Sequence, residues 1–305
     1  MTVLPSTAAV LDVVHRTLGR PSSITVLVDL PEERRILECR AGDRRVVVRC
    51  IPASIATSQF RHLDALSTAS ARCTTLQVPK PIALELTGDA GVLVLEHLAG
   101  SAYRRIVAPT GATPSAVHAM RLAGRALAEL HGIDPADVDG LPVTSMRDHI
   151  AQLVRPHPSE FASLFPCYAP LVDEAMSRIE SMPAASVRRA VLHRDVHLRQ
   201  MFRVDGRVGL IDWDLMAVGD PAFDVGYLVT HLVTHVERPD DLVDAVLTGY
   251  GDPLMTPDRL EPYRWFNLIR RACRRARLGD ADWLAEIDRM MAMLRDELER
   301  VDARA

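Results

Sequence analysis

The chain of 305 residues lacks several features that would place it in a specialised class of protein. Its five cysteines are odd in number and include no CxxC pair, so the sequence predicts neither a disulfide framework nor a zinc site. No run of about 18 apolar residues occurs, and the N-terminus lacks the basic start, apolar core and cleavage site of a secretory signal. We therefore expect a soluble, cytoplasmic protein that does not act at a membrane.

Lysine is nearly absent, since Lys80 is the only one and the other strongly basic side chains are arginines. The formal net charge is −4, whereas a general nucleic-acid binder usually carries a basic excess, so nucleic acid is not an expected partner. Hydrophobic residues make up 48% of the chain and charged residues 25%, as in an ordinary soluble protein. The length is sufficient for one large two-lobed domain or two ordinary ones, with a substantial core in either case.

The first third of the chain is predicted to be rich in strands, with a short leading helix over residues 5–19 and a second helix over 56–69. Runs of branched residues separated by turn-forming residues predict an antiparallel meander followed by two further strands. The expected strands are 24–30, 35–40, 45–51, 82–86 and 91–97.

From Gly100 onward apolar residues recur at three- and four-residue steps, which predicts helices. The expected helices are 114–132, 145–154, 168–181, 223–236, 239–250, 257–277 and 281–302. One hairpin interrupts them, with strands 201–204 and 207–212 around the dipeptide Asp205-Gly206. The sequence therefore predicts an α+β fold in two lobes: a small antiparallel-sheet lobe over residues 1–97 and a larger helical lobe over 98–305.

The run VLHRDVHLRQMFRVDGRVGLIDWDLMAVGDPAFDVGYL, residues 191–228, carries the clearest chemical signal. Asp195 and Asp212 lie at the end of a loop and of a strand that the hairpin joins, so both carboxylates are expected at one end of the hairpin. Phosphoryl transfer needs such a pair, because one carboxylate orients the attacking hydroxyl group and the other holds Mg²⁺ against the nucleotide phosphates.

This run resembles the catalytic loop and metal motif of the aminoglycoside phosphotransferase and choline kinase family, which implies a bilobal protein-kinase-like fold. The family reads H-G-D-x-H-x-x-N, then I-D-W-x, then G-D-P-x-x-D. The matching residues here are His193, Asp195, His197, Ile211, Asp212, Trp213, Gly219, Asp220, Pro221 and Asp224. Weaker similarity extends over VPKPIAL at 78–84, GVLVLEHLAG at 91–100 and LAELHGI at 127–133.

The resemblance implies that Asp195 is the catalytic base and that Asp212 bridges the metal and the phosphates. His193, in the catalytic loop, and Asp224 are implied to support that loop. The backbone of the connector between the lobes is implied to bind adenine, at Glu96, His97 and Leu98. The implied activity is transfer of the γ-phosphoryl group of ATP or GTP, with Mg²⁺, to a hydroxyl of a small antibiotic, aminosugar, nucleoside-like molecule or amino alcohol.

The sequence departs from the family pattern where nucleotide and metal are held. Gln200 stands at the position of the metal-binding asparagine, and Arg49 replaces the strand lysine that contacts phosphates; both are kept as candidate ligands. His62 occupies the usual position of the helix glutamate that pairs with this cation, and Asp64 is the nearest acidic substitute. The expected phosphate-covering loop, residues 28–36, contains no glycine, and no GxGxxG or GxxxxGK[ST] motif occurs.

These departures leave two other functions open: a non-catalytic, pseudokinase-like binding protein, or another nucleotide-dependent transferase on the same fold. An arginine group on the predicted helix 257–277 also has two interpretations. It is either a solvated face or part of an acceptor pocket that prefers an anionic or nucleoside-like molecule. Its members are Arg264, Arg270, Arg271, Arg274, Arg275 and Arg277.

Overall fold

The structure is a computed structural model that describes residues 7–30, 34–41, 43–107, 111–182, 189–279 and 281–304. The chain divides into two compact units. The sheet unit comprises Met1–Ser101, Ala136–Leu141 and Met201–Asp214, and the helical unit comprises Ala102–Pro135, Pro142–Gln200 and Leu215–Ala305. The α+β class is thus confirmed, while the predicted boundary between lobes after residue 97 stays a prediction.

A five-stranded antiparallel sheet in the order β1-β2-β3-β6-β5 dominates the sheet unit. Its strands are β1 (Ser23–Leu30), β2 (Arg34–Ala41), β3 (Arg44–Pro52), β5 (Pro81–Thr87) and β6 (Ala90–Glu96). Each strand coincides with a run of branched residues, so the predicted meander and the two later strands are confirmed. Residues 31–33, in the centre of the expected phosphate-covering loop, lie outside the described residues.

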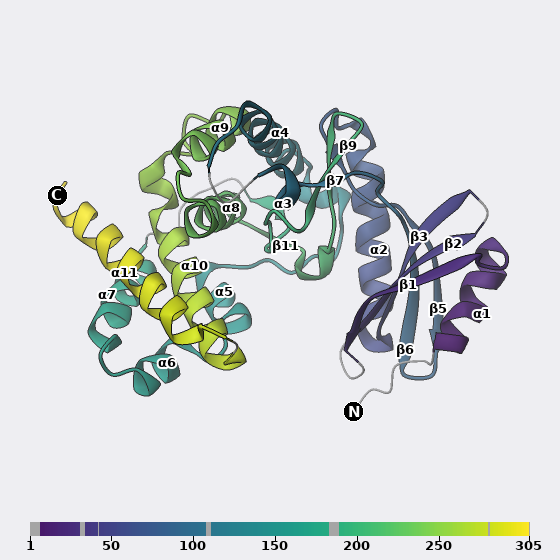
Figure 1. Cartoon of the computed structure of the whole chain (residues 1–305), viewed down its shortest axis with the longest axis horizontal. Helices are drawn as coiled ribbons and strands as arrows, with labels where there is room; N and C mark the ends of the chain where they lie inside the picture. Colours follow the sequence, from purple (N-terminus) through teal and green to yellow (C-terminus); the bar gives the residue numbers. More distant parts are fainter. Residues whose placement is uncertain are drawn as a thin grey trace. The chain divides into compact units, whose positions relative to one another are not determined.

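Two helices cover the opposite faces of this sheet: α1 (Thr7–Leu18) and α2 (Ala53–Ala69) (Figure 1). Val46, Val48 and Cys50 on β3 are buried in one core with the valines of α1. Because side chains alternate along a strand, Arg49 lies on the other face, which α2 covers. The alternation therefore places the only charged residue in the middle of β3 away from the apolar core around α1.

The hairpin of β9 (Met201–Val204) and β10 (Arg207–Leu210) belongs to a second sheet, with β4 (Leu76–Gln77) and β7 (Ser101–Ala102) at its edges. Asp205 and Gly206 form its turn with φ angles of 48° and 78°, as the dipeptide predicts. The strand expected over 207–212 ends at Leu210, because the φ of 69° at Asp212 is incompatible with extended backbone.

The helical unit contains most of the predicted helices and several short elements that the periodicity did not predict. Its helices are α3 (Tyr103–Ile106), α4 (Pro114–His131), α5 (Met146–Leu153), α6 (Pro158–Leu164), α7 (Ala169–Glu180), α8 (Ala222–His235), α9 (Asp240–Tyr250), α10 (Pro257–Leu278) and α11 (Trp283–Asp302). The strands β8 (Ala190–Leu192) and β11 (Ala217–Gly219) pair antiparallel. Within the described ranges, none of the helices has the length and apolarity needed to cross a membrane.

Helices α4 and α9 approach each other closely at two glycines. A Cβ atom at Gly124 would lie 2.0 Å from the Val246 carbonyl oxygen, and one at Gly249 would lie 2.0 Å from the Arg121 carbonyl oxygen. Each glycine thus allows the backbone of one helix to contact the backbone of the other. This contact fixes the relative position of the C-terminal ends of α4 and α9, where His131 and Tyr250 lie.

We expect Gly124→Ala to lower the free energy of unfolding by about 2 kcal/mol, because the new methyl group would force the two backbones apart. Urea denaturation measures this change. Arg125→Ala, at the adjacent exposed position of α4, is the matched control and should shift the free energy by less than about 0.5 kcal/mol. Equal stability of the Gly124 variant and the control would contradict the tight packing.

Candidate functional site

A buried carboxylate, Asp224 at the start of α8, holds the loop that follows β8. Its Oδ2 accepts a hydrogen bond of 2.8 Å from the His193 backbone amide, and its Oδ1 accepts one of 2.8 Å from the Arg194 amide. His131 Nε2 lies 3.3 Å from Oδ2, and His131 Nδ1 lies 2.9 Å from the Tyr250 hydroxyl. Burial alone would raise the pKa of Asp224, but its hydrogen bonds and the nearby histidines lower it, so the carboxyl group stays ionised.

The loop bends sharply where these two amides are held. Arg194 has a φ of 67°, a left-handed conformation that is unfavourable for a non-glycine residue. Its guanidinium group donates to Gln152 Oε1 at 2.9 Å. The His193 ring is fully buried, and its Nδ1 accepts the Asp195 backbone amide at 3.2 Å. Strained residues of this kind concentrate at functional sites, and here the bend projects the next side chain, Asp195, out of the core.

The Asp195 carboxylate is surrounded by hydrogen-bond donors and cations. Its Oδ1 accepts a 2.8 Å hydrogen bond from the Tyr227 hydroxyl and lies 3.5 Å from Arg270 Nη2. Its Oδ2 lies 3.6 Å from His197 Nε2. Because His197 Nδ1 accepts the Arg199 amide at 3.2 Å, the proton of a neutral His197 ring is on Nε2, facing the carboxylate.

These neighbours decide the protonation state of Asp195. Burial alone would raise the pKa of this carboxyl group, but the His197 hydrogen bond and the Arg270 charge hold it well below its usual range. Burial and the Asp195 charge raise the pKa of Tyr227 to about 12, so its hydroxyl keeps the proton that it donates. The Asp195 side chain nevertheless remains 22% exposed, and an ionised carboxylate is therefore accessible to a ligand.

In the sheet unit, the cation Arg49 lies close to two carboxylates, Asp212 and Asp214. Its guanidinium Nη2 donates to Asp214 and lies 3.5 Å from Asp212 Oδ1. Burial would lower the pKa of Arg49, but the charges of Asp214 and Asp212 hold it above its ordinary value. Asp64 on α2 is exposed and is not the acid that pairs with this cation, so the sequence missed Asp214 as its partner. Lys80 is exposed on the loop before β5.

The two carboxylates suit a hard divalent cation. Mg²⁺ is usually held by one or two carboxylates together with phosphate oxygens and water, so Asp212 and Asp214 supply an adequate donor set. Both lie close to one guanidinium nitrogen, which places their oxygens near each other. The third candidate, Gln200, ends the segment Pro142–Gln200 of the helical unit, and its backbone amide donates to the His197 carbonyl at 2.9 Å. Its role as a metal ligand stays a prediction.

The connector predicted to bind adenine packs on the hairpin within the sheet unit. A Cβ at Gly209 of β10 would lie 2.8 Å from Leu98 Cδ1. The Glu96 amide donates to the Lys80 carbonyl at 2.9 Å, and the Lys80 amide donates to Glu96 Oε2 at 3.1 Å. His97 Nε2 lies 3.6 Å from Glu38 Oε2. The contacts of Leu98 and Glu96 fix the path of the connector, while its contact with a base stays a prediction.

The arginine group of α10 divides into members with different surroundings. Arg270 contacts Asp195 and lies over the Tyr227 ring, 5.0 Å from its centroid. Arg271 donates to two histidines of α8, and Arg264 pairs with the buried Glu297 of α11. Arg274 is exposed. The interpretation as a uniformly solvated face is therefore wrong for these first three residues.

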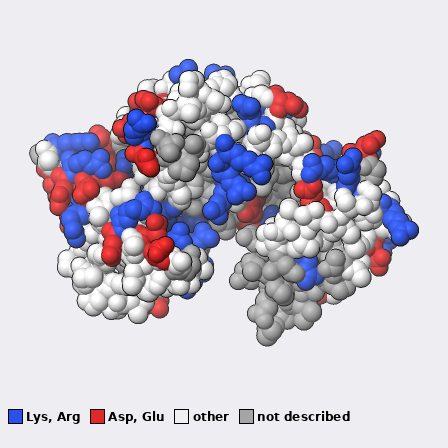
Figure 2. Space-filling model, viewed as in Figure 1, with Lys and Arg blue, Asp and Glu red and all other residues white. Residues whose placement is uncertain are grey.

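A cavity of about 460 Å³ lies among α8, α9, α10 and α11; its lining includes Arg264 of the arginine group but none of the residues predicted for catalysis, nucleotide or metal. Its walls include Val229 and Val233, which lie on the side of α8 away from Tyr227. Figure 2 shows basic and acidic side chains interspersed over α11, whereas the group over α3 is basic only. On the face drawn, positive charge thus gathers most clearly at α3.

Residues 32–266 match the model of a family described as the phosphotransferase enzyme family. No curated protein matches the chain in sequence. The structure is similar to that of a thermostable mutant of aminoglycoside phosphotransferase APH(4)-Ia in ternary complex with AMP-PNP and hygromycin B. The TM-score is 0.69 at 16% identity, covering 96% of this chain and 99% of that chain.

Two further solved structures show the same fold. One is amicoumacin kinase hAmiN in complex with AMP-PNP, Ca²⁺ and Ami, with a TM-score of 0.72 at 13% identity over 96% of this chain and 94% of that chain. The other is the GDP and kanamycin complex of APH(2")-IIIa, with a TM-score of 0.66 at 15% identity over 94% and 97%. The predicted protein-kinase-like fold is therefore confirmed.

We expect Asp224→Asn to lower the free energy of unfolding by about 2–3 kcal/mol, because its amide group cannot accept from both loop N–H donors. Chemical denaturation measures the loss. Asp173→Asn makes the same substitution at an exposed position of α7 and should have little effect. A variant as stable as this control would contradict the anchoring role of Asp224.

The depressed pKa of Asp195 gives a second expectation. An aspartate in an unfolded chain titrates near pH 4, and the folded pKa lies below this value. Asp195 therefore stabilises the fold above about pH 4, and this contribution is lost as the pH falls toward the folded pKa. Asp195→Asn should reduce the drop in unfolding free energy between about pH 6 and pH 3, measured by urea denaturation. Parallel curves for the two proteins would argue against the shift.

Proposed function

The chain belongs to the phosphotransferase enzyme family, and from this membership we propose that it transfers the γ-phosphoryl group of ATP or GTP to a hydroxyl group of a small molecule. The solved structures with this fold were obtained with AMP-PNP or GDP and with antibiotics, which supports a nucleotide donor and a small acceptor. An antibiotic, aminosugar, nucleoside-like molecule or amino alcohol is the acceptor class proposed for this chain.

The observation that carries the proposal is the state of Asp195, an accessible carboxylate that stays ionised while two donors fix its orientation. Phosphoryl transfer requires little covalent help from the protein and depends on positioning the attacking hydroxyl. We assign Asp195 to accept a hydrogen bond from that hydroxyl and to take its proton as the new oxygen–phosphorus bond forms and the bond from the γ-phosphorus to the departing nucleoside diphosphate breaks. His193 acts through the loop and is a positioning residue, since its ring is fully buried.

The Arg49 cluster supports the nucleotide half of the proposal. We assign Arg49 to the donor phosphates and Asp212 to Mg²⁺, with Asp214 positioning Arg49 and Gln200 as a further candidate ligand. When bound, Mg²⁺ would neutralise charge on the phosphate oxygens. The backbone at residues 96–98 is the proposed contact for the base.

One contact favours the non-catalytic alternative. Arg49 lies 3.5 Å from Asp212, so in this arrangement the proposed phosphate ligand and the proposed metal ligand interact with each other. In a pseudokinase-like protein this ion pair would persist and the metal would not be recruited. In a kinase, Arg49 and Asp212 exchange part of this interaction for contacts with the nucleotide and the metal. Metal-dependent nucleotide binding therefore distinguishes the two functions.

We expect ATP or GTP to raise the melting temperature of the parent protein more strongly with Mg²⁺ than without it, because ligands that bind only the folded state stabilise it. Asp195→Asn should keep this metal-dependent shift but lower kcat for transfer to a phosphate-accepting alcohol by about 10²–10⁴-fold. Asp212→Asn should lose the metal dependence. Thermal shift and mass spectrometry of acceptor mixtures provide the two measurements.

Asp205→Asn is the matched control, because Asp205 is exposed in the hairpin turn and its positive φ is tolerated by asparagine. It should behave as the parent protein in both measurements. A parent protein that binds nucleotide without metal dependence and modifies no acceptor would support the pseudokinase. A product carrying a nucleotidyl group instead of a phosphoryl group would identify a different transferase.

A further inference from the structure

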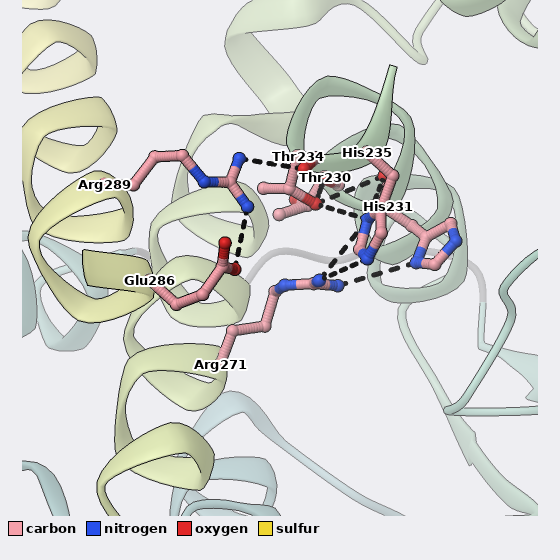
Figure 3. Close-up of polar contacts among 7 residues, drawn as sticks. All are labelled: Thr230, His231, Thr234, His235, Arg271, Glu286 and Arg289. Atoms are coloured by element: carbon pink, nitrogen blue, oxygen red, sulfur yellow. Dashed lines mark hydrogen bonds and ion pairs between the residues drawn. The ribbon is translucent and has the colours of Figure 1, made fainter. Parts of the chain in front are cut away.

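Arg271 of α10 is a partly buried cation whose contacts are unusual. Its Nη2 lies 3.0 Å from His235 Nε2, and its Nη1 lies 3.5 Å from His231 Nδ1 (Figure 3). The nearby Glu286 interacts with Arg271 electrostatically, but the direct ion pair of this carboxylate, at 2.9 Å, is with Arg289. Among the residues that the structure describes, no carboxylate forms an ion pair with Arg271. A guanidinium group removed from water usually gains such a partner.

The two histidines cannot supply a compensating negative charge. Their rings stack at a centroid distance of 4.1 Å, and burial together with the positive neighbours keeps both rings neutral. The pKa of His231 is lowered to about 2 and that of His235 to about 4. Burial also lowers the pKa of Arg271 to about 10, which leaves it charged at neutral pH. Arg271 thus retains its positive charge while its hydrogen-bond contacts are with neutral rings.

This charge belongs to the surroundings of Asp195. The His231 ring stacks on His197 at 5.4 Å, and His197 Nε2 faces the Asp195 carboxylate at 3.6 Å. The preceding residue, Arg270, lies 3.5 Å from the same carboxylate. Tyr227, which donates to Asp195, interacts electrostatically with both Arg270 and Arg271. Arg270 therefore contacts the carboxylate directly, while Arg271 is connected to it through His231 and His197.

The charge imbalance discriminates between acceptors. A polycationic molecule whose hydroxyl reached Asp195 would be repelled by both guanidinium groups, and like charges brought together cost free energy. A carboxylate or phosphate group would instead receive charge-assisted hydrogen bonds, which guanidinium forks make in pairs. The neutral rings of His231 and His235 leave Arg271 free to exchange their weak contacts for an anion.

We propose that Arg270 and Arg271 form an anion subsite beside Asp195, so that the acceptor carries a carboxylate or phosphate group near its reactive hydroxyl. This inference rests on the proposed function for the identity of the acceptor, but the subsite itself is defined by binding. Arg274, one helical turn beyond Arg270, is exposed and lies outside the subsite.

The test is calorimetric titration of the full chain, saturated with Mg²⁺-ADP so that the nucleotide phosphate contacts are occupied. Inorganic phosphate and malonate are the two probes, and the tighter one identifies the preferred anion. We expect Arg270→Gln and Arg271→Gln each to weaken binding of the preferred probe by about tenfold or more, because each removes a charge-assisted hydrogen bond. Arg274→Gln, the matched control on the same helix, should bind within about twofold of the parent protein.

Arg271→Lys distinguishes an effect of the lost charge from an effect of misfolding. It keeps the positive charge and should recover part of the affinity, and circular dichroism with thermal unfolding checks each variant. Absence of binding by both probes, or equal losses in the Arg271 variant and the Arg274 control, would overturn the subsite. If the variants lost affinity for the probe only in titrations without Mg²⁺-ADP, the arginines would bind the nucleotide phosphates instead. This result would also overturn the subsite.

Failure of the subsite and failure of the proposed function are distinguishable. The titration measures binding, so a chain that transferred no phosphoryl group would still bind the probes if the subsite exists. Conversely, an active kinase that modified a polycationic alcohol with parent-like KM in the Arg270 and Arg271 variants would keep the function and remove the subsite.

Discussion

The double hydrogen bond from two consecutive backbone amides to Asp224 is the constraint on which the helical unit's site depends. A buried carboxylate is tolerated only when its oxygens are satisfied, and here the His193 and Arg194 amides satisfy them together with His131. The same geometry imposes the left-handed backbone at Arg194 and directs Asp195 outward. The loop is therefore positioned by Asp224 of α8, which His131 of α4 supports.

The two units carry opposite arrangements of charge, one centred on a carboxylate and the other on a cation. The helical unit surrounds one carboxylate, Asp195, with donors and cations, whereas the sheet unit holds one cation, Arg49, against Asp212 and Asp214. An ionised carboxylate among donors suits a neutral hydroxyl group that must lose a proton. A guanidinium beside two carboxylates suits phosphates accompanied by a divalent cation. The proposed phosphoryl transfer thus assigns its two chemical requirements to separate sets of residues.

The sequence predicted the parts of this arrangement that depend on local pattern. Neighbouring residues determine the strands, the Asp-Gly turn and the spacing around Asp195 and Asp224. These features could therefore be predicted from the sequence. Tyr227 and His131 were missed, since their roles arise only when α8, the loop and α4 come together. Helical periodicity also could not separate Arg270 from Arg274, because four residues place both on one face of α10. Arg270 differs from Arg274 because its guanidinium group packs on the loop after β8. It lies 3.5 Å from both the Arg194 carbonyl oxygen and the Asp195 carboxylate.

The substitution of arginine for lysine on β3 and the missing glutamate on α2 have a common physical explanation. A lysine buried to the extent of Arg49, which is 7% exposed, would tend to lose its proton, whereas a guanidinium keeps its charge and can contact two carboxylates. Asp214, close in sequence to Asp212, supplies the counter-charge that the family pattern takes from the helix. His62 can therefore occupy the helix position without leaving the strand cation unbalanced, because Asp212 and Asp214, which follow the hairpin, hold its charge.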